Sequence, residues 1–138
     1  MTRGDASALP NSTENRSETA ADAPRRTGRP RVLLANEPRA YREGIAAVIG
    51  QLRPEVEIRT VEPEAMDGSI LRFSPDMEVC SKATDALRDR VRVWVELYPE
   101  HAAHSVASIG GSLVEYAEIQ LPDLLSIVDR AEELSRTN

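Results

Sequence analysis

The sequence predicts an α/β domain built around a mostly parallel sheet. Short apolar runs and stretches with helical spacing of apolar residues alternate along residues 30–97. Units of that kind give parallel strands joined by right-handed crossovers. A different pattern over residues 98–117 predicts that the sheet ends in an antiparallel hairpin.

The first predicted strand covers residues 31–35, a continuous apolar run that indicates burial on both faces. A helix is predicted over residues 39–52, because its apolar residues recur at helical spacing. Pro54 lies just beyond this helix and helps to end it. The recurring apolar residues are Ile45, Val48, Ile49 and Leu52.

Two further strands and a short helix are expected next. Residues 56–61 alternate between apolar and polar, which predicts a strand with one wetter face. Pro63 can open a helix over residues 64–73, since a missing N–H is tolerated in the first turn. Gly68 weakens that helix. Residues 76–81 form the third predicted strand.

The fourth strand has the clearest pattern in the chain. A helix over residues 84–91 precedes it, with Thr84 as its N-cap. Residues 91–97 then alternate strictly, so two sets of side chains face opposite ways. One face carries Val91, Val93, Val95 and Leu97, and the other carries Arg92, Trp94 and Glu96.

The next link is too short for a parallel crossover. Residues 98–104 are fewer than the dozen or so that such a connection needs, so we expect the chain to return antiparallel. Residues 105–109 and 112–117 then read as a hairpin. Gly110 and Gly111 between them can supply the positive φ angles of a two-residue turn.

Composition sets the expected domain boundaries. Residues 1–29 contain no aromatic side chain and are rich in Ser, Thr, Ala, Asn and charge. They offer too little burial to offset the entropy of ordering, so we expect a disordered tail. The folded domain should cover residues 30–134 and close with a helix over 121–134, which leaves 135–138 as the C-terminal end.

Charge disfavours nucleic acid as a partner. The net charge is −6, and residues 1–29 hold five arginines against four acids, so the predicted domain carries the negative charge. Phosphate contacts need a basic surface, so no direct nucleic-acid binding is expected. We interpret the basic stretch 24–31 as a solvated linker. Without an apolar leader or a run of membrane-spanning length, the chain is expected to be cytoplasmic, with no membrane partner.

Three segments together resemble one family. "RVLLANEPRAYREGIAAVIGQLRPEVEI" (31–58) resembles the opening of response-regulator receiver domains of the NarL/LuxR type, which begin with a strand, two acids and a helix containing Arg-Glu-Gly. "SPDMEVCS" (74–81) is similar to the segment that leads to their phosphoacceptor, and residues 121–134 to their closing helix. The resemblance implies a CheY-like, flavodoxin-like sheet. The short link after residue 97 then implies a shortened or missing fourth helix.

Receivers depend on a small set of charged residues. Two acids after the first strand and an Asp after the third bind Mg²⁺, which prefers oxygen ligands. That third-strand Asp takes a phosphoryl group from a histidine kinase. A Thr or Ser after the fourth strand and a Lys after the fifth contact the phosphate.

In this chain most of those positions have changed. The acid pair falls on Asn36 and Glu37, and the acceptor falls on Ser81, whose hydroxyl forms no acyl phosphate. The switch hydroxyl falls near Leu97. The Lys that receivers carry after the fifth strand has no counterpart, because the single lysine of this chain, Lys82, lies beside the acceptor position. The resemblance therefore implies a degenerate phosphorylation pocket of Asn36, Glu37, Ser81 and Lys82, with no metal and no cofactor.

These observations lead to two functional hypotheses. In the first, the chain is a stand-alone, non-phosphorylatable receiver-like domain that acts in signal transduction, of the two-component kind, by binding another protein or itself. In the second, it is a response regulator still controlled by phosphorylation or a small ligand at the Glu37/Ser81 pocket. In the first hypothesis the fourth strand and the hairpin are the expected binding region.

Trp94 and Tyr98 are the candidate partner surface. Trp94 points away from the apolar face of its strand, and a missing fourth helix would leave its side of the sheet with less cover. The alternative is that the last helix or the hairpin covers Trp94.

Other candidates favour structural interpretations. Glu37, Glu78 and Asp76 could hold a divalent cation weakly, but Glu78 fits an outward strand position and Asp76 a turn. Cys80, the only cysteine, is expected to be an inert core thiol. A modified Ser81 is conceivable, but a small polar residue filling a vacated pocket is the simpler interpretation.

No enzyme activity is expected. A nucleophile with its base could be formed by Ser105 with His101 or His104. These residues lie within a few positions of one another, however, and lack a third group to orient them. We interpret them as part of a solvated loop.

Overall fold

The computed structural model describes residues 29–98 and 104–136. These residues form an α/β fold with one six-stranded mixed sheet, which confirms the predicted class. The expected N-terminal tail lies, apart from Arg29, outside the described residues. The strands are β1 (Arg31–Leu34), β2 (Glu57–Thr60), β3 (Met77–Cys80), β4 (Val93–Glu96), β5 (Ser105–Ile109) and β6 (Ser112–Tyr116). The helices are α2 (Arg39–Leu52), α3 (Met66–Phe73), α4 (Asp85–Arg90) and α5 (Leu121–Arg136), with a short 3₁₀-helix, Pro63–Ala65.

The strands are ordered β2-β1-β3-β4-β5-β6. β1 to β4 are parallel to one another, whereas β5 is antiparallel to both β4 and β6. The expected parallel arrangement therefore holds for the first four strands only. The antiparallel return after β4 is the one that the short link predicts. Residues 99–103 of that link, where the fourth helix was expected to be shortened or missing, lie outside the described residues.

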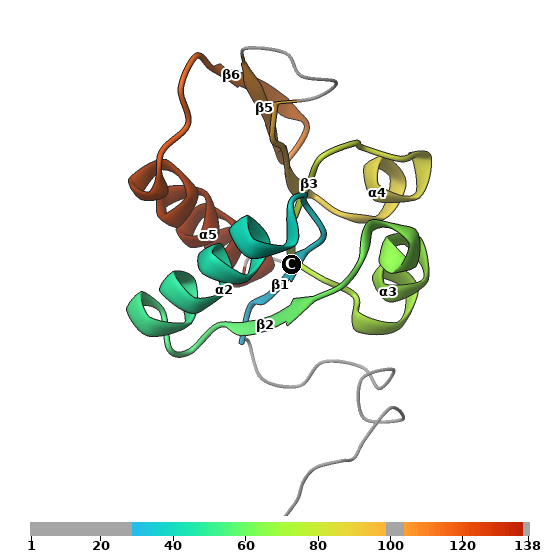
Figure 1. Cartoon of the computed structure of the whole chain (residues 1–138), viewed down its shortest axis with the longest axis horizontal. Helices are drawn as coiled ribbons and strands as arrows, with labels where there is room; N and C mark the ends of the chain where they lie inside the picture. Colours follow the sequence, from blue (N-terminus) through green and yellow to red (C-terminus); the bar gives the residue numbers. More distant parts are fainter. Residues whose placement is uncertain (1–28, 99–103, 137–138) are drawn as a thin grey trace, which may run out of the picture.

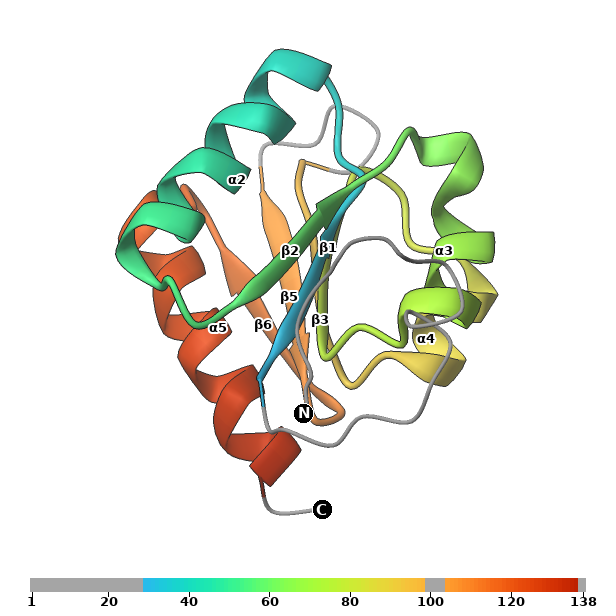
Figure 2. The same ribbon diagram turned by 90° about the horizontal axis from the view of Figure 1, so that it is seen from below.

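Helices cover both faces of the sheet. Figures 1 and 2 show α2 and α5 on one side and α3 and α4 on the other. Alternate residues of a strand pack into the apolar layers on the two faces of the sheet, because successive side chains point to opposite faces. Val32 and Leu34 of β1 are buried with α2 and α5, while Leu33 is buried with α3 and α4.

Trp94 lies inside the second of these layers. Its side chain is 8% exposed and belongs to the cluster that contains Phe73 of α3 and Leu87 of α4. The prediction that Trp94 marks an exposed partner surface is therefore wrong. Trp94 is covered by α3 and α4, and not by the last helix or the hairpin. Tyr98, just after β4, is 36% exposed.

The predicted hairpin is confirmed. Gly110 and Gly111 have φ angles of +59° and +95°, which fit a type I′ turn. Ile109 pairs with Ser112 across this turn. β6 is the last strand of the sheet, at the opposite edge from β2 (Figure 1).

Candidate functional site

The residues that follow β1 and β3 meet at one end of the sheet. The two strands are parallel and in register, and Ala35 N donates to Val79 O at 2.8 Å. Glu37 and Ser81 follow directly, and the backbone N–H of Glu37 donates to Ser81 Oγ at 2.9 Å. The structure thus brings together Glu37 and Ser81, two of the residues that were expected to share a pocket.

Ser81 and its neighbours differ in their access to solvent. Ser81 is half-buried, whereas Lys82 is exposed, as is Glu37 with 58% of its side chain accessible. The loop after Ser81 is fixed by Glu96 of β4, whose Oε2 accepts from Ala83 N at 2.8 Å. Ser81 therefore lies at the start of a loop that is fixed by a hydrogen bond to Glu96, and its side-chain oxygen already accepts one hydrogen bond.

Arg42 of α2 supplies a buried positive charge beside the acid position. The residue is 2% exposed, and its Nη1 donates to the Asn36 carbonyl at 3.3 Å. Its Nη2 donates to Glu62 Oε2 at 2.9 Å, and Nη1 lies 3.9 Å from Glu37 Oε2. A guanidinium therefore lies close to the Glu37 carboxylate.

The roles of Arg42, which lies in the Arg-Glu-Gly segment, and of Glu62 were not predicted from the sequence. A signal was present in the helix pattern. Arg42, Ile45 and Ile49 are the buried residues of α2, at the i, i+3 and i+7 positions of one stripe. A charged residue on the apolar stripe of a helix indicates a buried charge that needs polar partners.

Asn36 is fully buried, with 0% exposure. Neither its side-chain nitrogen nor its side-chain oxygen has a hydrogen-bond partner among the described residues, and Arg42 Nε has none either. An unpaired buried polar group costs about 1–3 kcal/mol. A buried carboxylate at this position would cost more, so the amide is the less unfavourable of the two.

Glu78 of β3 is a second buried polar side chain, and its position corrects the expectation of an outward residue. It is 0% exposed, and both carboxylate oxygens lack a partner in the described structure. In the sheet it lies between Leu33 and Trp94, on the side covered by α3 and α4. Burial, with a smaller contribution from the charge of Asp67, raises the pKa of Glu78 to about 9. The side chain is therefore protonated at neutral pH.

Cys80, two residues further along β3, is buried as expected for a core thiol. Its Sγ lies 3.6 Å from Val95 O. Burial is the largest of the causes that raise the pKa of this thiol, so the reactive thiolate form is disfavoured.

Asp76 lies away from the Glu37 site, and Ser105 and His104 belong to the start of β5 and the residue before it. Asp76 precedes β3 at the opposite end of the sheet, where its Oδ2 accepts from Arg31 N at 2.8 Å. Ser105 begins β5, is fully buried, and accepts from Tyr98 N at 3.0 Å, so it is not part of a solvated loop. His104 is exposed, and His101 lies outside the described residues. Within residues 29–98 and 104–136, no three His, Cys, Asp or Glu side chains are grouped as metal ligands would be.

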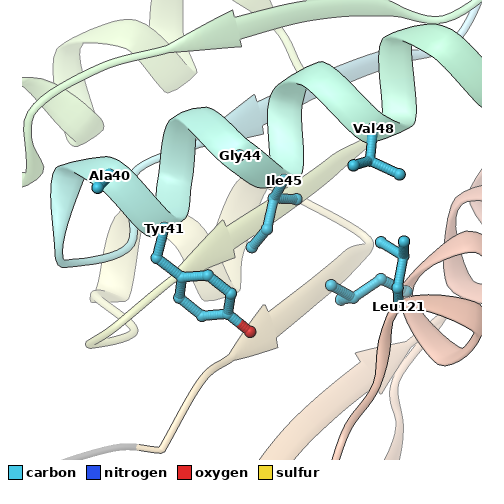
Figure 3. Close-up of a pocket in the computed structure, with 7 residues that line it drawn as sticks. Ala40, Tyr41, Gly44, Ile45, Val48 and Leu121 are labelled. Atoms are coloured by element: carbon cyan, nitrogen blue, oxygen red, sulfur yellow. The ribbon is translucent and has the colours of Figure 1, made fainter.

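An apolar groove of about 390 Å³ lies between α2 and the start of α5. Figure 3 shows Tyr41, Ile45 and Val48 of α2 facing Leu121 across it. Tyr41 is 42% exposed, and its pKa is raised, first by burial and then by Tyr98. The volume is within the range of small-molecule sites, but the lining offers few polar groups to orient a ligand. The lining residues are Ala40, Tyr41, Gly44, Ile45, Val48, Leu121 and Leu124.

Comparisons of the chain with models of protein families, with curated proteins and with solved structures found no match. In the part of the chain that the structure describes, no helix combines the length and the apolar composition needed to cross a bilayer.

Proposed function

We propose that residues 30–134 are a receiver-like regulatory domain of the cytoplasm that acts by binding protein and is not phosphorylated on aspartate. The observation that carries this proposal is the 2.9 Å hydrogen bond from Glu37 N to Ser81 Oγ. A serine hydroxyl lies where the resemblance to receivers calls for the phosphoacceptor, at the carboxyl edge of the sheet. Crevices outside the carboxyl ends of strands are the usual ligand sites of open α/β sheets.

The arrangement of the first four strands supports the receiver-like part of the proposal. The order β2-β1-β3-β4, with helices on both faces, is the one that flavodoxin-like sheets share. The antiparallel β5 departs from that pattern. It alters the region that follows β4, which is where receivers place their signalling surface.

The charges at the site support the loss of phosphorylation. Mg²⁺ is held through carboxylate oxygens, and Glu37 is the one carboxylate among Asn36, Glu37 and Ser81. Arg42 Nη1, 3.9 Å from that carboxylate, repels a second cation. Ser81 offers a hydroxyl, which forms no acyl phosphate. Binding of a protein partner is then the route of regulation that the proposal adopts.

Amide NMR tests the proposal. The full chain is titrated with beryllofluoride and Mg²⁺, and separately with acetyl phosphate and Mg²⁺. We expect no shift at residues 35–38 or 81–84, because the metal has one carboxylate and a nearby guanidinium. A receiver that carries all three acids shows in parallel that the reagents are active.

Two variants sharpen the experiment. Asn36→Asp with Ser81→Asp restores the missing carboxylates, and Ser81→Ala removes the hydroxyl while leaving the loop charge unchanged. Shifts in the unmodified chain that disappear in Ser81→Ala would overturn the proposal. They would favour instead a regulator controlled by phosphorylation or a small ligand at Glu37 and Ser81.

A further inference from the structure

β6 is an edge strand that exposes apolar side chains. In the described part of the sheet it pairs with β5 on one side only. Leu113 is 69% exposed and Val114 is 39% exposed. Such an edge presents unpaired backbone N–H and C=O groups that can pair with another strand.

The turn decides which backbone groups face outward. In a two-residue hairpin the residues that flank the turn, Ile109 and Ser112, exchange hydrogen bonds, and hydrogen-bonded and non-hydrogen-bonded pairs then alternate. The N–H and C=O of Ser112, Val114 and Tyr116 therefore point to β5. Those of Leu113 and Glu115 point away from the sheet.

We propose that β6 pairs antiparallel with β6 of a second copy of this chain, around a two-fold axis at Val114. The outward groups of Leu113 then exchange hydrogen bonds with those of Glu115 in the second copy, and the reverse pair does the same. Val114 faces Val114 of the second copy as a non-hydrogen-bonded pair. This inference rests on the proposed function, because it names the protein partner.

The composition of β6 fits a second copy. Edges that avoid pairing carry Lys or Pro, or charges that point inward. β6 contains no Lys, Arg or Pro, and its one charged residue is Glu115. In the proposed dimer Glu115 faces Leu113 of the second copy and not another acid. A two-fold interface also closes on itself, so pairing stops at a dimer.

The opposite edge of the sheet differs. β2 carries Glu57 and Arg59, charges of both signs, within four residues. Arg31 of β1 forms an ion pair with Glu57 at 3.2 Å, and Arg59 lies 4.4 Å from the centre of the Phe73 ring. Exposed apolar side chains are thus a property of the β6 edge and not of β2.

Disulfide crosslinking tests the register. Residues of a non-hydrogen-bonded antiparallel pair have Cα atoms about 4.5 Å apart, within reach of a disulfide. Val114→Cys should give a crosslinked dimer under mild oxidation. Leu113→Cys is the matched control, because this more exposed position faces Glu115 of the second copy. We expect at least about fivefold less crosslinking from Leu113→Cys. Cys80 is buried and does not compete.

Sedimentation of the full chain tests the dimer itself. We expect the mass to double as the protein concentration rises. The dimer should be weak, because the interface is small. Leu113→Pro should abolish it, since proline removes an N–H that faces the partner and spares the bonds to β5. Circular dichroism should show this variant folded, and Leu113→Lys provides a second disruption without a backbone change.

Several results would overturn the inference. They are a monomer at every concentration, equal crosslinking of the two cysteine variants, or a folded Leu113→Pro that still dimerises. A ladder of larger species would show head-to-tail pairing of β6 with β2 instead. None of these outcomes bears on the beryllofluoride titration, so failure of the dimer and failure of the phosphorylation proposal are separable.

Discussion

Replacing Glu78 by Gln should stabilise the protein, and the gain should depend on pH. With a pKa of about 9 the folded side chain keeps its proton at pH 7, whereas the unfolded chain, at the ordinary value of 4.5, has lost it. Folding must therefore take up a proton. At 1.36 kcal/mol per pH unit over the interval from 4.5 to 7, this uptake costs about 3 kcal/mol. Gln has nearly the same shape and does not ionise, so it avoids that cost.

The direction of the pH dependence follows from the raised pKa. The folded state binds more protons than the unfolded state between about pH 4.5 and pH 9, so the contribution of Glu78 to stability falls as pH rises through that window. It is constant below and above the window. The advantage of Glu78→Gln should therefore be small at pH 5 and should grow by about 1.4 kcal/mol per pH unit up to pH 8.

Urea unfolding of both proteins at pH 5, 6, 7 and 8 measures this difference. Glu64→Gln, at an exposed glutamate, controls for the loss of an acid as such. An equal stability difference at pH 5 and pH 8 would refute the reasoning. It would mean that Glu78 is ionised in the folded state, or has found a partner such as a buried water.

Three other substitutions probe the core and the caps, each followed by urea unfolding. Arg42→Ala should lose about 1–3 kcal/mol, because it leaves the buried Asn36 carbonyl without its donor, whereas Glu62 is half exposed and can be hydrated; Arg42→Lys, which keeps the charge, should lose less. Trp94→Ala should lose about 3–5 kcal/mol, because its side chain is buried between the sheet and the helices α3 and α4; a loss near zero would contradict that burial. Thr84→Ala should lose about 1 kcal/mol, since Thr84 Oγ1 accepts from Leu87 N at 3.2 Å, whereas Thr84→Ser should retain the cap.

The sequence predicted local features well because they depend on local rules. The N-cap at Thr84 and the turn at Gly110 and Gly111 are set by residues within one turn of the chain, and both are confirmed. The antiparallel return after β4 was also predictable, since a link of seven residues cannot make a parallel crossover.

Burial depends on which elements pack together, so the burial of Trp94 and Glu78 could not be predicted from the local sequence pattern. Alternation correctly placed Trp94 opposite to the apolar face of its strand, but it gave no measure of how far α3 and the six-residue α4 cover the side of the sheet that carries Trp94 and Glu78. The contact between Arg42 and Glu62 joins residues 20 positions apart and was likewise beyond any local pattern. The meeting of Glu37 with Ser81 was foreseen only because the resemblance to receivers supplied the strand order.

The two proposals together imply a particular kind of control. A phosphorylated receiver is switched by a covalent group, so its state depends on a kinase. The proposed domain has no such switch. Arg42 lies beside Glu37, and β6 forms an unpaired edge of the described sheet. Its fraction of dimer follows mass action alone, so abundance, or a competing strand that occupies β6, would set its state. Because both copies are acidic, added salt should screen their repulsion and strengthen the dimer, the opposite of what an interface held by ion pairs would show.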